Sequence, residues 1–138
     1  MKNLLLALGI FLITFSTKAQ EETVTVNVTI DNVLNDKGTI LVSLHNNETF
    51  MKGLGVIDMQ EKAKKGTISI SFENVVAGEY AVMVLHDEND NKRMDFEANG
   101  MPKESYGMSG NSMPMRPPTF IDAKFEVTNE DLDLSIRF

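Results

Sequence analysis

The hydrophobic pattern of this chain repeats every two residues over most of its length. Between residues 24 and 30, valine and isoleucine alternate with threonine and asparagine, and similar alternation returns at residues 40–44, 68–72, 121–127 and 132–138. Successive side chains of a β-strand point to opposite faces, so this alternation indicates strands with one buried face. The pattern limits the chain to an all-β fold.

Two further segments refine this prediction. Residues 80–86 are apolar on both faces, which is typical of a central strand. Residues 46–65 are less regular, and we expect a solvated excursion there with one or two helical turns at residues 59–65. Six or seven short strands separated by turn residues predict an antiparallel β-sandwich with one long Gly/Pro/Met loop.

The first 20 residues have the features of an export signal. Lys2 precedes an apolar run over residues 4–15, and small side chains at Thr17 and Ala19 favour cleavage near Ala19 or Gln20. The run is shorter than the roughly 20 apolar residues of a spanning helix. We therefore expect a signal peptide at 1–20 and a single domain at 21–138 with no membrane span, located in the periplasm or outside the cell.

Charge and cysteine content exclude several classes of function. The formal net charge is −7, and removal of residues 1–20 with their two lysines makes it −9. A chain this acidic is not expected to bind nucleic acid or anionic lipid surfaces. The chain has no cysteine, which excludes a disulfide, a lipid-anchored amino terminus and a thiol nucleophile.

An acidic segment after the central strand suggests a cation site. Asp87, Asn89, Asn91 and Asp95 occupy relative positions 1, 3, 5 and 9, and the carbonyl of Arg93 is available at position 7. Calcium loops place oxygen ligands at these positions. The spacing predicts a Ca²⁺-type loop.

Three departures from the calcium pattern keep a second interpretation open. Position 6 is Lys92 instead of glycine and would need a positive φ, position 12 is Ala98, and Glu97 comes one residue early. The loop is then either a weak calcium site, in the range of about 10⁻⁴ to 10⁻³ M typical of extracellular modules, or a set of solvated Asx-turns.

His86 and Glu104 frame the same segment. A histidine beside carboxylates could serve a metal-dependent hydrolase, but a histidine at a strand end is more often structural. No G-x-S-x-G elbow frames the nearby serines, and His45 lies on a different strand. We favour a non-enzymatic protein with no catalytic residues, in which His86, Glu104, Tyr106 and Phe120 contribute to a ligand surface.

Five of the nine methionines lie in the long loop, at positions 94, 101, 108, 113 and 115. Clustered thioethers can bind copper(I), whereas methionine also fills irregular gaps beneath a loop. Packing or an adaptable binding surface is the preferred interpretation.

Two resemblances add to this interpretation. Phe72, Gly78 and Tyr80 resemble a hairpin of transthyretin-like and carboxypeptidase-regulatory-like sandwiches, in which the glycine makes the turn. Residues 86–95, 100–109 and 117–123 resemble, in order, the motifs of an exported bacterial family called domain of unknown function 2141. The resemblance implies a signal peptide and a compact β domain, without an established activity. Lys92 replaces the glycine of that family's first motif.

Together these features predict an exported β-sandwich that acts as a binding or structural module. Its partner would be an unidentified ligand or an envelope protein, and Ca²⁺ is the one cofactor the residues suggest. A metal-dependent hydrolase using His86 and loop carboxylates is the alternative.

Overall fold

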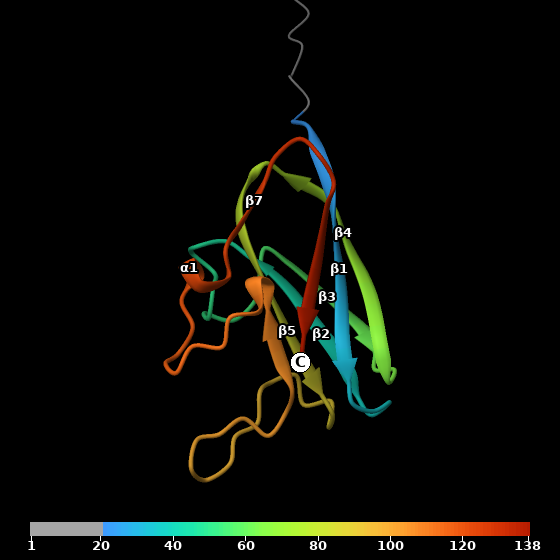
Figure 1. The fold of residues 1–138 in the computed structure, drawn as a ribbon, viewed down its shortest axis with the longest axis vertical. Helices are drawn as coiled ribbons and strands as arrows, with labels where there is room; N and C mark the ends of the chain where they lie inside the picture. The colour runs from blue at the N-terminus through green and yellow to red at the C-terminus, as the bar shows by residue number, and fades with distance from the viewer. Residues whose placement is uncertain (1–20) are drawn as a thin grey trace, which may run out of the picture.

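The computed structural model describes residues 21–138, which form two β-sheets packed face to face (Figure 1). The signal peptide expected at residues 1–20 lies outside the described residues. The first sheet has the strand order β4-β1-β8, and the second has the order β3-β2-β5-β6, with β7 also paired to β5. The strands are β1 (Thr23–Val33), β2 (Thr39–His45), β3 (Ile57–Lys62), β4 (Gly66–Val76), β5 (Gly78–Asp87), β6 (Tyr106–Met108), β7 (Phe125–Val127) and β8 (Leu132–Arg137).

The predicted all-β sandwich is confirmed, and the alternating residues form its core. The inward side chains of β1, at Val26, Val28 and Ile30, are fully buried, while the intervening residues face outward. β5 lies between β2 and β6, as its apolar faces indicate. One pairing departs from an antiparallel arrangement, since β8 runs parallel to β1.

Two local predictions are wrong. Residues 57–62 form the strand β3 and not the helical turn expected at residues 59–65. Within residues 21–138, β3 is an edge strand that pairs with β2 alone, and its exposure at most positions removes the alternating pattern. Residues 120–123 form a short helix, α1 (Phe120–Ala123), so the strand expected over residues 121–127 covers only 125–127. The carboxylate of Asp122 accepts hydrogen bonds from the backbone N–H and hydroxyl of Thr119, which favours the helical turn.

The connection from β4 to β5 also differs from expectation. Only Ala77 separates the two strands, yet β4 pairs with β1 and β5 pairs with β2. The chain therefore crosses from one sheet to the other and does not make a hairpin. The ring of Tyr80 packs over Gly78, where an added Cβ would lie 3.3 Å from it.

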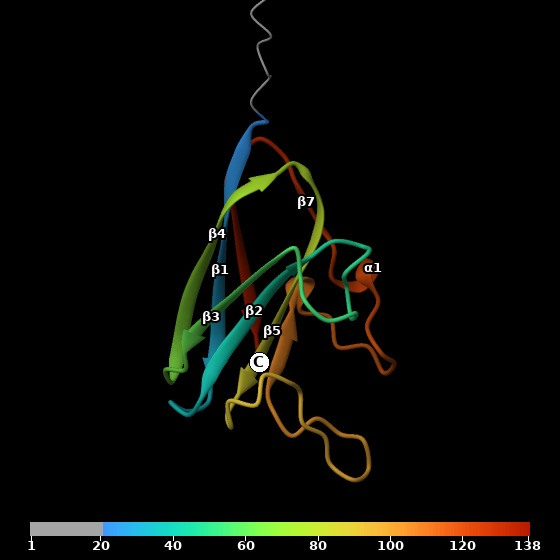
Figure 2. The same cartoon turned by 180° about the vertical axis from the view of Figure 1, so that it is seen from behind.

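The predicted long loop is divided into two by a return to the sheet. Residues 88–105 leave β5, β6 then pairs with β5, and the 3₁₀ turn η1 (Ser109–Asn111) begins a second excursion that ends in α1. Both views show the first loop projecting from one end of the sandwich and α1 on its flank (Figures 1 and 2). We call these segments the acidic loop (residues 88–105) and the flank loop (residues 109–123).

Candidate functional site: the acidic loop

The acidic loop starts where β5 meets the turn between β1 and β2. Gly38 has a φ of 66°, and a Cβ added there would lie 1.9 Å from the carbonyl oxygen of Asp87. Only glycine permits so close an approach between the two backbones. The turn and the loop are thereby fixed at the same end of the sandwich.

Asp87 organises the start of the loop from a fully buried position. Its Oδ1 accepts a hydrogen bond from the backbone N–H of Asn91 at 3.1 Å, and its Oδ2 accepts one from that of Lys92 at 2.7 Å. Lys92 has a φ of 61°, which confirms the positive φ expected at this position. The chain therefore makes the sharp turn that a calcium loop needs at position 6, although lysine replaces glycine there.

The remaining candidate ligands converge around Asp95. The side-chain amides of Asn89 and Asn91 donate to Oδ2 of Asp95 at 2.6 and 2.8 Å. The backbone N–H of Asn91 donates to Oδ1 of Asn89, and that of Arg93 donates to Oδ1 of Asn91, so both asparagines also make Asx-turns. The side chains at positions 3, 5 and 9 are thus linked to one another by hydrogen bonds, and Asp87 at position 1 joins them through the backbone N–H of Asn91.

Glu104 has a role that the sequence did not reveal. Its carboxylate is 7% exposed and accepts hydrogen bonds from the backbone N–H groups of Glu88, at 3.0 Å, and Asp95, at 3.1 Å. The backbone N–H of Lys103 donates to the carbonyl of Asp95 at 2.8 Å. Glu104 therefore closes the base of the loop. Its partners Glu88 and Asp95 lie 16 and 9 positions earlier in the chain, and no short sequence motif predicts these contacts.

His86 is fully buried beside this clamp. Its Nε2 lies 2.8 Å from the carbonyl oxygen of Lys37, and its ring stacks on Phe138 with centroids 6.2 Å apart. Its Nδ1 has no hydrogen-bond partner among residues 21–138. His45 lies toward the other end of the β2–β5 ladder, where burial lowers its pKa despite contacts with Thr49 and Asp58. The two histidines are not brought together.

The proposed ligand-surface residues do not form one surface. Tyr106 is half-buried in β6 opposite Leu85, whereas Phe120 packs with Phe50 at a ring distance of 6.0 Å, beneath the flank loop. Of the loop methionines, Met108 is buried in the same cluster as Phe120. Met101, Met113 and Met115 are exposed. In residues 21–138, no group of three or more His, Asp or Glu side chains is placed to hold a metal ion.

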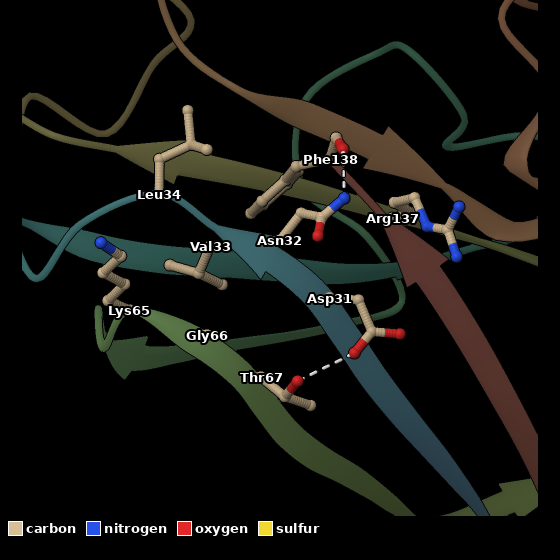
Figure 3. A pocket seen from close by; sticks show the side chains of 9 residues that line it. All are labelled: Asp31, Asn32, Val33, Leu34, Lys65, Gly66, Thr67, Arg137 and Phe138. Carbon is tan, nitrogen blue, oxygen red and sulfur yellow. Dashed lines mark hydrogen bonds between the residues drawn. The ribbon is translucent and has the colours of Figure 1, made fainter.

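An open groove of about 600 Å³ lies at the same end of the sandwich and was not predicted (Figure 3). Leu34 and Phe138 line it together with Asp31, Lys65 and Arg137. The side-chain amide of Asn32 donates to the carbonyl of Phe138, and Thr67 donates to Asp31. Since Phe138 also stacks on His86, the floor of the groove is joined to the start of the acidic loop.

The fold and this loop define a class: a small β-sandwich with a carboxylate-clamped loop at one end. Residues 28–135 match the family described as "Uncharacterized protein conserved in bacteria (DUF2141)", and the chain belongs to that family. No curated protein and no solved structure matches the chain. No helix in the described residues is long and apolar enough to cross a membrane.

Proposed function

We propose that this protein is an exported, non-enzymatic binding module whose acidic loop takes up a calcium-type cation. The observation that carries the proposal is the convergence of Asp87, Asn89, Asn91 and Asp95 around a turn with a positive φ at Lys92. Export is supported by the basic and apolar pattern of residues 1–20.

Cation binding would replace the hydrogen bonds that the side chains of Asn89 and Asn91 now make, including those of their Asx-turns. The amides of Asn89 and Asn91 now donate to Asp95, and rotation about their side-chain torsions would turn their oxygens toward a shared centre. The carbonyl of Arg93 would complete the set with water. Two carboxylates and two neutral amides favour weak binding, in keeping with the extracellular range of about 10⁻⁴ to 10⁻³ M.

The hydrolase alternative receives no support from the geometry. His86 is fully buried, with Nε2 beside the carbonyl of Lys37 and its ring against Phe138. Both oxygens of Glu104 accept backbone hydrogen bonds. These groups do not converge on a concave surface where a substrate could reach them.

Thermal melting with and without divalent cations tests the proposal. At ten times its dissociation constant, calcium should stabilise the protein by about 1.4 kcal/mol, and Asp95→Asn should abolish this gain. Glu126→Gln is the matched control, because Glu126 is exposed on β7, away from the loop. Equal melting temperatures in chelator and in 10 mM calcium, about ten times the weakest expected dissociation constant, would reject cation binding.

A further inference from the structure

The sandwich has strand edges that are protected in different ways. β8 lies at one edge of its sheet, and Asn111 covers it: the side-chain amide donates to the carbonyl of Ser135, and its oxygen accepts from the N–H of Arg137. The edge strand β3 is short and carries Asp58, Glu61 and Lys62 in exposed positions. Charged side chains and short length both discourage pairing with another strand.

Residues 66–72 of β4 form an edge with neither protection, because the charge of Glu73 and the β-bulge at Asn74 lie beyond this stretch. β4 is 11 residues long and, within the part of the chain that the structure describes, pairs with β1 alone. It lies at the outer side of the sheet in both views (Figures 1 and 2). Residues 66–72 contain no charge and no proline, and exposed Thr67, Ser69 and Ser71 alternate with buried apolar residues. Such an edge leaves a row of backbone donors and acceptors available to another strand.

The sequence of this edge is complementary to itself. Inward side chains of β4 have even residue numbers between 68 and 72, and outward ones have odd numbers. When two copies of β4 pair antiparallel, each inward residue must lie opposite an inward residue, so the two numbers of every pair must be both even or both odd. A twofold axis at Ile70 satisfies this rule and places Ile68 opposite Phe72 of the second copy. On the outer face the same axis places Ser69 opposite Ser71, and Thr67 opposite Glu73, so no like charges meet.

We propose that β4 is a dimerisation edge, at which a second copy of this chain adds its own β4 antiparallel about a twofold axis at Ile70. The two three-stranded sheets would then form one continuous six-stranded sheet. A single strand pair buries less surface than the roughly 1,200 Å² of a stable interface, so the dimer is a weak one. Higher salt should strengthen it, because both copies carry a net negative charge.

Sedimentation velocity of the purified protein from about 10 µM to about 1 mM tests this proposal. The wild type should shift from monomer to dimer within that range. Ser69→Glu combined with Ser71→Glu places two glutamates opposite each other at two symmetry-related positions of the strand pair. This repulsion should raise the dissociation constant of the dimer about tenfold or more. Ser69→Lys combined with Ser71→Glu pairs opposite charges in the same register and should restore or strengthen the dimer.

The control is Thr128→Glu combined with Asn129→Glu, which adds the same charge at exposed positions between β7 and β8. It should leave the dissociation constant close to that of the wild type, and circular dichroism should show that every variant is folded. A wild type that stays monomeric over the whole range would overturn the proposal. So would a double-glutamate variant that dimerises as well as the control, or a Lys/Glu variant as weak as the double-glutamate one.

Discussion

The acidic loop and the flank loop leave the same sheet but are held by different forces. The acidic loop is fixed by two buried carboxylates, Asp87 and Glu104, which accept four backbone hydrogen bonds between them. The flank loop is fixed by a cluster of apolar side chains around Phe120, Phe50 and Met108. The first anchor depends on charge and directed hydrogen bonds, and the second depends on area removed from water. Cation concentration and substitution of the buried carboxylates should therefore act on the acidic loop and leave the flank loop in place.

The largest expected effect tests the apolar anchor. Phe120 is 8% exposed and makes edge contacts with Phe50, so Phe120→Ala should lower the free energy of unfolding by about 3 kcal/mol or more. Urea denaturation measures the change. The adjacent Ile121→Ala is the control, because Ile121 is 77% exposed and its loss should cost less than about 0.5 kcal/mol. Equal costs would show that the cluster does not anchor the flank loop.

The next effect tests the carboxylate anchor. Glu104→Gln keeps the size of the side chain but places an amide group against a backbone N–H, which should cost about 2 kcal/mol. The loss should be local: amide exchange at Glu88 and Asp95 should accelerate, while the flank loop keeps its protection. Glu88→Gln serves as the control because its side chain makes no hydrogen bond in the described residues. Equal acceleration of amide exchange in the acidic loop and the flank loop would show that the two loops are not held independently.

A smaller change should strengthen the acidic loop. Lys92 has a φ of 61°, and Lys92→Gly would relieve a cost of about 1 kcal/mol, partly offset by the greater freedom of glycine when unfolded. The substitution also removes a positive charge from the acidic loop. Thermal melting should show a modest gain in chelator and a further gain in calcium. A variant less stable than the wild type in both conditions would contradict this account of the turn.

The smallest effect concerns the exposed ion pair that caps the flank loop. Arg116 donates to both oxygens of Asp122 at 2.7 and 2.8 Å, and this contact, with hydrogen bonds from Thr119, lowers the pKa of Asp122. A carboxyl with a lowered folded pKa adds stability above its unfolded pKa, near 4, and this stability is lost as the pH falls further. Melting curves from pH 7 to pH 2 should therefore show the wild type and Asp122→Asn converging at acid pH. A constant difference between them would contradict the shift.

The sequence predicts the features that depend on neighbouring residues and misses those that depend on residues distant in the chain. Alternation predicts the sandwich and the central position of β5, because both depend on local pattern. It misses β3, whose edge position leaves both faces exposed, and it misses α1, whose Thr119–Asp122 contacts outweigh a short alternating run. Spacing predicts the positive φ at Lys92, while the cation site itself stays a prediction. It does not predict the Glu104 clamp or the Phe138 groove, because both join segments that are far apart in sequence.

The parallel pairing of β8 with β1 has a consequence for the order in which this protein folds. β1 is the middle strand of its sheet, and one of its two neighbours is supplied by residues 132–137, close to the end of the chain. A folding chain can pair β1 with β4 across a short separation, but the other side of β1 stays unpaired until residues 132–137 join it. Completion of the first sheet thus depends on a contact between residues about 100 positions apart, which makes it a slow step of folding.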